Sequence, residues 1–377
     1  MSYSTRFLLI VLRLAIGWHL LIEGYVKLHS LWTGPTETNR PFTSRYYLQQ
    51  SVGPFRGFFL WIVGGDPDEN LLARLSVEIE GGQARLSPQL RQYYEAYLKN
   101  FARTFQIDET LLAQLREKLQ QHEQIVANWL AHGEEEWAKP TAWYPVKKKQ
   151  RVPEWLAEYR QLAADLHTLR HAERRYFERP VGQERADRLS SEIAWYRQQF
   201  SEALAQRTQG LLKSWYDLLP ADKKTTALSD VPEPSSEPVW LGRSSVWWVD
   251  RTTAWGLTLS GSLLLFGLLS RLAAWLGCGL LMLFYLCQPP LPWVPSPERT
   301  EGYYLYINKT LIEALALAVL GLVPTGRWFG LDGLLNVLWR RRARSTPTST
   351  PTNIPSSTSP GPPVPQPDAG PPRRESS

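Results

Sequence analysis

The sequence predicts an all-α protein: a four-helix transmembrane bundle with an inserted extracytoplasmic α-helical domain, a coiled hairpin, and a disordered C-terminal tail. Three observations support this fold class. Apolar residues concentrate near each end of the 377-residue chain, the middle is polar with apolar residues at helical spacing, and the last part is rich in Pro, Ser and Thr. The expected segments are 1–65 (first transmembrane helix and interfacial segment), 66–245 (insert), 246–339 (transmembrane helices two to four) and 340–377 (basic stop and tail).

The first transmembrane helix is predicted from Phe7 to Leu28. This mostly apolar run has about 22 residues, and at ~1.5 Å per residue it crosses a ~30 Å hydrocarbon core. A signal peptide is the alternative. Because the run contains Arg13, Glu23 and Lys27, and no small-x-small cleavage site follows it, we expect a retained helix.

Three further spans are predicted near the C-terminus. The apolar block from Thr252 to Leu286 is too long for one span and is interrupted at Ser270-Arg271, the pattern of two helices joined by a tight turn. The fourth span runs from Ile307 to Val323. It follows a Pro-rich loop and a Tyr303-Tyr304-Leu305-Tyr306 cluster that is typical of a membrane–water interface.

Basic residues predict the orientation of these spans. Arg6 precedes the first span, Arg271 lies between spans two and three, and four arginines lie within 340–344, after span four. In a four-span protein all three positions fall on the same side of the membrane. Both termini are therefore expected in the cytoplasm, and the large loop after span one is expected outside it.

The first half of the extracytoplasmic loop contains local structure signals. Segment 57–63 is apolar but too short to span, so we expect it to lie at the membrane interface. Residues 77–86 fit a small hairpin about Gly81-Gly82. Helix starts are predicted at Ser87-Pro88 and at Asp108, and the second of these helices should end near Gly133.

The second half of the loop predicts an antiparallel helical hairpin. Segments 153–178 and 182–219 carry apolar or aromatic residues at helical spacing with charged residues between them, and Arg179-Pro180-Val181 separates the two. From Ser345 onward the chain is Pro/Ser/Thr-rich without aromatic residues, so a disordered tail is expected.

Charged residues within the spans are the candidate functional residues. A charge at the centre of a span costs roughly 2.5–3.5 kcal/mol on insertion scales, so each needs a partner. Arg13 and Lys27 share one seam of the first helix with Gly17 and Gly24, and the glycines allow another helix to approach closely. Glu23 flanks that seam, four residues from both His19 and Lys27.

We expect Glu23, Lys27, Lys309 and Glu313 to form one outer-leaflet cluster, roughly 5–10 Å below the surface, because span one rises outward while span four descends. Two interpretations stay open: the charges only hold the bundle together, or they line a site for a quinone or similar amphipathic ligand, or a proton route to it. In the second interpretation Glu23 and Glu313 are the candidate catalytic residues that exchange protons with the quinone. The candidate ligand-binding residues are Lys27, Lys309, Tyr303, Tyr304 and Tyr306.

A second group of charges belongs near the cytoplasmic side. Arg13, Arg271 and Asp332 are expected there as structural membrane charges, with Arg13 and Asp332 as a pair.

Several other chemistries are disfavoured by composition and spacing. Cys278 and Cys287 are the only cysteines and lie in an apolar run, which excludes a disulfide framework and a cysteine-ligated zinc or iron–sulfur site. His167 and His171 are four residues apart but lack a companion ligand motif, so no metal site is expected. The near balance of 42 Lys+Arg and 36 Asp+Glu argues against a nucleic-acid partner.

The membrane segments resemble a known family in combination. The segment Arg13–Leu28 (RLAIGWHLLIEGYVKL) resembles the first helix of the DoxX/DoxD-like membrane proteins. Gly267–Ala274 (GLLSRLAA) resembles the family's turn into its third helix, and Tyr304–Ala316 followed by Gly326–Asp332 resembles its fourth helix and exit. The resemblance covers roughly residues 5 to 65 and 250 to 335, which is the membrane part of the chain.

This resemblance implies a multi-pass inner-membrane protein. Some relatives are the small subunit of thiosulfate:quinone oxidoreductase, which suggests quinone as the ligand, no covalently bound cofactor, and a redox partner subunit in the lipid bilayer. The insert departs from the family's compact pattern and indicates a further protein partner, which we expect to bind through residues 153–219. The alternative function is a non-catalytic membrane scaffold that recruits partners through this hairpin. A transporter is less favoured, because neither broken helices nor a repeat is evident in the sequence.

Overall fold

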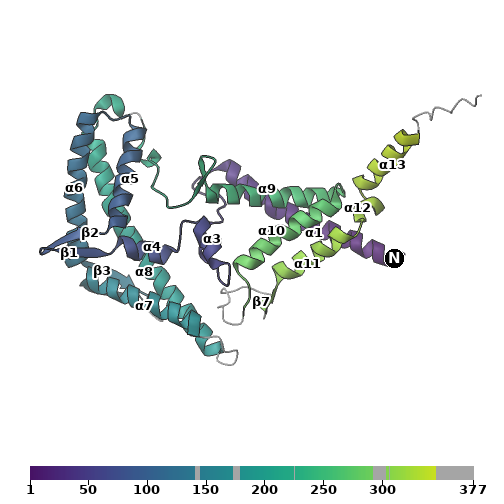
Figure 1. Ribbon diagram of the computed structural model, residues 1–377, viewed down its shortest axis with the longest axis horizontal. Helices are drawn as coiled ribbons and strands as arrows, with labels where there is room; N and C mark the ends of the chain where they lie inside the picture. The colour runs from purple at the N-terminus through teal and green to yellow at the C-terminus, as the bar shows by residue number, and fades with distance from the viewer. Residues whose placement is uncertain (141–144, 173–178, 225, 292–302, 305, 345–377) are drawn as a thin grey trace, which may run out of the picture. The chain divides into compact units, whose positions relative to one another are not determined.

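The computed structural model describes the chain except for residues 141–144, 173–178, 225, 292–302, 305 and 345–377 (Figure 1). The described residues are mostly helical, and their only strands form four two-stranded hairpins, which is consistent with the predicted all-α class. The chain divides into two units, Met1–Gly333 and Leu334–Ser377. The predicted disordered tail from Ser345 onward lies outside the described residues.

Four apolar helices pack around one hydrophobic core (Figure 1). They are α1 (Tyr3–Thr33), α9 (Ser245–Phe266), α10 (Ser270–Cys287) and α11 (Lys309–Leu322). α1 packs along α9, and α10 packs along both α9 and α11, whereas α1 and α11 touch only over a short stretch. The bundle is therefore least closed on one side, which we call the α1–α11 face.

Among the described helices, α1 and α10 are long and apolar enough to cross a membrane. Neither α9 nor α11 meets the same standard. Asp250 and Arg251 lie in the first two turns of α9, and α11 has only 14 residues. The bundle thus has the predicted number of helices, and two of them have the character of membrane spans.

Small residues bring the backbones of α1 and α9 into contact. A Cβ atom added to Gly24 would lie 2.4 Å from the backbone nitrogen of Thr258, and one added to Gly261 would lie 2.3 Å from the nitrogen of Leu21. Such distances leave no room for a side chain. The predicted role of the glycines on α1 is confirmed at this helix pair.

The turn between α9 and α10 lies slightly earlier than expected. α9 ends at Phe266, and Gly267 adopts a left-handed conformation (φ 63°) as its C-cap, so that Ser270-Arg271 already begins α10. Glycine accepts this conformation without a Cβ clash and ends the helix there. After α11, the chain continues through α12 (Thr325–Trp328) to α13 (Leu331–Arg344), so the predicted basic stop is helical.

A smaller hydrophobic core, separate from that of the four-helix bundle, lies beside the start of α9. It joins α2 (Arg45–Gln49) and α3 (Arg56–Ile62) to the ends of α9 and α10. The segment expected at the membrane interface is helical in α3, with Phe59 and Leu60 buried and Phe58 and Trp61 exposed. This amphipathic division is what an interfacial helix requires.

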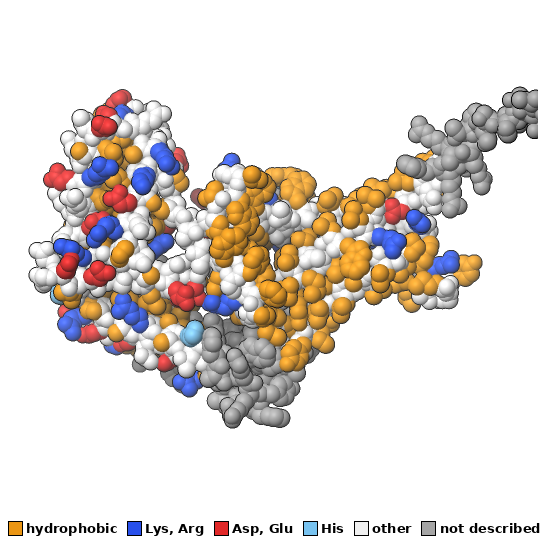
Figure 2. Space-filling model, in the orientation of Figure 1, with side chains coloured by type: hydrophobic (Ala, Val, Ile, Leu, Met, Phe, Trp, Pro, Cys, Tyr) orange, Lys and Arg blue, Asp and Glu red, His pale blue; other side chains and the backbone are white. Residues whose placement is uncertain are grey.

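The insert has its own hydrophobic core, in which the large aromatic side chains of Tyr94, Trp155, Phe200 and Trp215 are fully buried. Its elements are α4 (Pro67–Arg74), β1 (Val77–Glu80), β2 (Gln83–Leu86), α5 (Pro88–Thr104), α6 (Glu109–His132), β3 (Glu134–Lys139), β4 (Val146–Arg151), α7 (Val152–Ala172), α8 (Arg179–Leu218) and the short turns η2 (Ala221–Lys223) and η3 (Leu228–Asp230). Charged side chains are interspersed over its visible surface, whereas apolar ones cover the bundle (Figure 2).

The predicted helix starts in the insert are confirmed. The Ser87 hydroxyl accepts a hydrogen bond from the Leu90 N–H (3.2 Å), and the Asp108 carboxylate accepts one from the Leu111 N–H (3.0 Å). The hairpin about Gly81-Gly82 is also present, with Glu80 paired to Gln83.

Two features of the insert differ from expectation. Residues 179–181 are helical rather than a break, because Pro180 sits at the start of α8, where its missing N–H has no partner to lose. The connection between α7 and α8 at 173–178 is outside the described residues. The hairpin β3–β4 was not predicted, and it pairs an acidic strand with a basic one, with Lys149 and Glu134 joined by a 2.7 Å ion pair.

Candidate functional site

Three charged or polar side chains on α1 and one on α11 form a connected cluster. Lys27 Nζ lies 2.5 Å from Glu23 Oε2, one helical turn away on α1. His19 Nε2 lies 3.9 Å from Glu313 Oε2 and so links α1 to α11. Glu23 is in turn within electrostatic range of both His19 and Glu313. We call these four residues, His19, Glu23, Lys27 and Glu313, the His19 cluster.

The His19 cluster lies on the α1–α11 face and is open to the surroundings. The side chains of His19 and Glu23 are 58% and 52% exposed, and that of Glu313 is 22% exposed. Their neighbours on the same helix, such as Trp18, Ile22 and Tyr25, are exposed apolar residues. The cluster is therefore a polar site on an otherwise apolar surface.

Lys309 was expected as a member of this cluster and the three tyrosines as part of the same site; all of them lie at or just before the start of α11. Lys309 is the first residue of α11, one turn before Glu313. Tyr306 is held through its backbone: its N–H donates to the Pro290 carbonyl (2.8 Å) and its carbonyl accepts from the Tyr285 hydroxyl (2.9 Å). Tyr303 and Tyr304 form strand β7, and their side chains are outside the described part of the chain.

The structure places His19 within the cluster, whereas the sequence indicated it only as a neighbour of Glu23 on α1. The i, i+4 spacing on α1 predicts the contacts within that helix. The contact of His19 with Glu313 depends on how α1 is rotated toward α11, and no spacing rule encodes that rotation.

A second polar cluster lies at the other end of the bundle, around the fully buried side chain of Arg13. Its Nη2 donates a 2.6 Å hydrogen bond to the carbonyl oxygen of Phe329. Asp332 lies within electrostatic range of Arg13, but its oxygens accept hydrogen bonds from the N–H of Leu269 (2.7 Å) and from the N–H (3.1 Å) and hydroxyl (2.9 Å) of Ser270. Arg13 and Asp332 therefore interact electrostatically, as expected, but Asp332 uses its hydrogen bonds to cap the start of α10.

Arg271 also contacts backbone. Its Nε donates to the Gly321 carbonyl (3.1 Å) and its Nη2 to the Leu322 carbonyl (3.3 Å), at the C-terminal end of α11. A cation at that position satisfies carbonyls that have no helical partner. Arg13, Arg271 and Asp332 therefore connect helix ends, which fits a structural role.

The insert contains a polar cluster of its own, in which two stacked tyrosines bind carboxylates. The Tyr159 hydroxyl donates to Asp68 (2.6 Å), the Tyr196 hydroxyl donates to Glu158 (2.5 Å), and the two rings are parallel at 5.8 Å. Burial by itself would raise the pKa of Glu158, but hydrogen bonds from Tyr196, Gln150 and Lys148 outweigh it and lower that pKa to about 2. These contacts tie α7 and α8 to α4 and β4.

The remaining candidates have no site around them in the described residues. No group of three His, Cys, Asp or Glu side chains there is placed to hold a metal ion. His167 is exposed on α7, and Cys278 and Cys287 are free thiols buried in the bundle. The His19 cluster is the strongest candidate site.

The chain was compared with known proteins at the level of families and structures. No family model, curated protein or solved structure matches it significantly. The resemblance of the membrane segments to DoxX/DoxD-like proteins therefore stays a prediction from the residues themselves. The chemistry of the His19 cluster is consequently argued from its own groups: two carboxylates, an imidazole and an ammonium, which together can donate, accept and relay protons.

Proposed function

We propose that the chain is a membrane-embedded subunit of a quinone-linked redox complex, similar to the small subunit of thiosulfate:quinone oxidoreductase. In this proposal α1, α9, α10 and α11 all cross the inner membrane, both termini are cytoplasmic, and the insert lies outside. The observation that carries the proposal is the exposure of the His19 cluster on an apolar helical surface.

The exposure of these groups favours a ligand over a purely structural role. A charged side chain facing lipid is costly, and intramembrane ionisable residues are accordingly paired or face a binding site. Arg13 is fully buried and bonded to backbone, as a structural charge should be. His19 and Glu23 are more than half exposed. A bound quinone, whose carbonyl oxygens accept hydrogen bonds, would cover them.

The cluster provides the groups that quinone reduction needs. Lys27 and Lys309 would donate hydrogen bonds to the quinone oxygens, while Glu23 and Glu313 would deliver the two protons that accompany two electrons. His19, whose Nε2 lies 3.9 Å from Glu313, would relay a proton between the carboxylate and the quinone. The electrons would come from a partner subunit that oxidises thiosulfate or a similar donor.

A test uses the full chain in lipid nanodiscs with decyl-ubiquinone as the probe. Glu23→Gln keeps the size of the side chain but removes the proton it exchanges. We expect quinone binding to weaken and quinone reduction, assayed with the co-purified partner, to fall by about 10²-fold.

Glu117→Gln, an exposed carboxylate on α6, is the matched control and should leave both values unchanged. Equal binding and turnover in Glu23→Gln and the unmodified chain would contradict the proposal.

The alternative, a non-catalytic scaffold, is supported by the independent core of the insert and by the large exposed side chain of Ile125 on α6. Deleting 153–219 is unsuitable as a test, because it removes the buried residues Trp155, Phe200 and Trp215 and with them the core. A photo-reactive residue at Gln198, on the exposed side of α8, leaves that core intact. Cross-linking of one defined protein at this position, in a sample that binds no quinone, would favour the scaffold.

A further inference from the structure

Two β-hairpins immediately precede two of the bundle helices. β5 (Val239–Trp240) and β6 (Arg243–Ser244) lead into α9, and β7 (Tyr303–Tyr304) and β8 (Ile307–Asn308) lead into α11. The strands of each hairpin are antiparallel, and those of the first are joined by the two-residue turn Leu241-Gly242.

The last residue of each hairpin is the N-cap of the helix that follows. The Ser244 hydroxyl accepts from the Trp247 N–H, and the Asn308 side chain accepts from the Leu311 N–H. Because α9 and α11 run in the same direction through the bundle, both hairpins lie at its same end.

Each hairpin places a bulky residue in a strained turn position. Leu241 has φ 48° and Tyr306 has φ 60°, in the left-handed region that favours glycine. Leu241 as a residue is also 89% exposed. A strained and exposed leucine at a turn costs free energy in water and points to a functional constraint.

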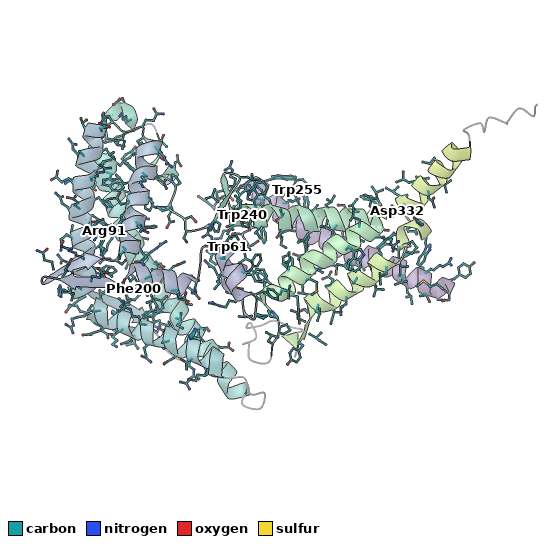
Figure 3. The ribbon with its side chains drawn as sticks, in the orientation of Figure 1. Trp61, Arg91, Phe200, Trp240, Trp255 and Asp332 are labelled. Atoms are coloured by element: carbon teal, nitrogen blue, oxygen red, sulfur yellow. The ribbon has the colours of Figure 1, made fainter. Side chains whose placement is uncertain are left out.

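The first hairpin belongs to a larger aromatic surface. The Trp240 ring lies 5.8 Å from that of Trp61 on α3 (Figure 3), and the Trp240 carbonyl accepts a 2.8 Å hydrogen bond from the Trp248 indole. The exposed apolar residues of this surface come from the hairpin β5–β6 and from α3. We define the aromatic rim as Phe58, Trp61, Val239, Trp240 and Leu241.

Two arginines lie next to this rim and stack on one indole. The guanidinium carbons of Arg243 and Arg251 lie 5.5 Å and 3.8 Å from the ring centroid of Trp247. Neither arginine has a salt-bridge partner among the described residues. Nearby Arg45 and Arg56 by contrast are paired with Glu237 and Asp66.

The neighbouring carboxylate of Asp250 lies within electrostatic range of Arg251 but forms no salt bridge with it. Asp250 accepts a 2.6 Å hydrogen bond from the Ser44 N–H. The two guanidinium groups on Trp247 therefore keep donors for an external anion, and their planar forks match the geometry of a phosphate.

We propose that the aromatic rim inserts into the headgroup layer of the outer leaflet, and that Arg243 and Arg251 bind the phosphate of a phospholipid there. Trp and Tyr are favoured at this depth of a bilayer, and lipid contact explains why Leu241 is apolar and exposed. The rim is continuous with the apolar surface of the bundle through the buried contacts of α3 with α9. This inference rests on the membrane location in the proposed function, but not on quinone binding.

The test measures depth with a nitroxide spin label in the full chain reconstituted into phosphatidylglycerol-containing vesicles. The label is placed at Leu241→Cys, at Ile79→Cys as a matched control on the exposed hairpin β1–β2, and at Trp18→Cys on α1. Collision with oxygen, which concentrates in lipid, is compared with collision with a water-soluble nickel chelate.

We expect the labels at 241 and 18 to collide preferentially with oxygen and the label at 79 with the nickel chelate. A label at 241 that behaves like the one at 79 would overturn the rim proposal. The label at 18 separates this failure from a failure of the membrane location, because it reports on the bundle alone.

The phosphate site is tested by native mass spectrometry of lipid retained after detergent exchange. Arg243→Gln combined with Arg251→Gln should reduce retained phosphatidylglycerol by about fivefold or more, since each basic residue near the surface contributes to anionic lipid binding. Arg85→Gln, on the control hairpin, should not change it. Equal retention in the double variant would overturn the phosphate assignment, and displacement of the lipid by inorganic phosphate would assign the site to a free anion instead.

Discussion

The Nη2 atom of Arg13 lies 2.6 Å from the carbonyl oxygen of Phe329, a residue more than three hundred positions later in the chain. Its Nε and Nη1 atoms are buried without a hydrogen-bond partner among the described residues. Asp332 lies within electrostatic range and supplies the opposite charge. This arrangement ties the first helix of the bundle to the segment that follows its last, and it makes the stability of the bundle depend on Asp332.

Replacing Asp332 should destabilise the bundle strongly. Asp332→Ala removes the cap of α10 and leaves the buried Arg13 charge uncompensated, at a cost of about 3 kcal/mol. Asp332→Asn removes the same charge but keeps one acceptor oxygen for the cap, so it should lose about 2 kcal/mol. Unfolding of the full chain by SDS titration in mixed micelles measures both values. Equal stability of the two variants would show that the cap contributes nothing, and an Asp332→Asn variant as stable as the unmodified chain would show that the charge of Asp332 has no role.

Two glycine-to-alanine substitutions should have different effects on stability, because Gly261 lies in the contact between α1 and α9, whereas Gly279 lies on an exposed part of α10. Gly261→Ala should destabilise the bundle by about 1–3 kcal/mol, because its Cβ would clash with the backbone of Leu21. Gly279→Ala, with nothing near its Cβ, should be neutral or stabilise by up to about 1 kcal/mol. Thermal unfolding in detergent compares them. A Gly261→Ala variant as stable as the unmodified chain would show that the contact between α1 and α9 leaves room for a Cβ atom.

One hydroxyl joins α9 to α10. The Ser260 hydroxyl donates a 2.7 Å hydrogen bond to the Ala273 carbonyl, whereas the Ser262 hydroxyl bonds to Thr258 within its own helix. Ser260→Ala should therefore cost about 0.6–1.7 kcal/mol, the range of interhelical hydrogen bonds in membranes. Ser262→Ala should cost close to nothing in the same unfolding assay. Equal losses would assign no special value to the interhelical bond.

The insert should lose stability in mild acid because of His122 on α6. Burial, together with nearby Arg207, lowers the pKa of His122 to about 4, and its ring packs edge-on against Tyr94. The unfolded chain binds this proton near pH 6.5, so it takes up the proton first as the pH falls. The stabilisation is complete above pH 6.5 and is lost progressively down to pH 4, with about 2 kcal/mol lost by pH 5.

Hydrogen exchange of α6 peptides in the full chain, corrected for the intrinsic rate, measures this effect between pH 7 and pH 5. His122→Gln should remove most of the pH dependence, whereas His167→Gln, an exposed position on α7, should retain it. An unchanged pH profile in His122→Gln would exclude His122 as its origin.

The helix starts at Ser87 and Asp108 could be predicted because a cap bonds only two or three residues ahead. The hairpins at β5–β6 and β7–β8 could not be predicted, since strands of two residues have no periodicity. The start of α8 was misplaced because a proline can begin a helix as well as interrupt one.

The candidate site was predicted in part. Glu23 and Lys27 were expected together from their spacing, and Glu313 was expected at the same depth as Glu23. The bridge from His19 to Glu313 required the rotation of α1 about its axis. The backbone partner of Arg13 required the position of Phe329, which lies in an irregular connection between α12 and α13.

The sequence by itself determined the helical character of this protein, the apolar composition of its bundle helices and the charges that they carry, because these depend on residues within one or two turns of each other. Only the tertiary structure decided which charges are buried and which are exposed. That difference separates Arg13, enclosed by helix ends, from His19 and Glu23 on the α1–α11 face. The physical reason is that burial depends on how helices distant in sequence pack around their small residues.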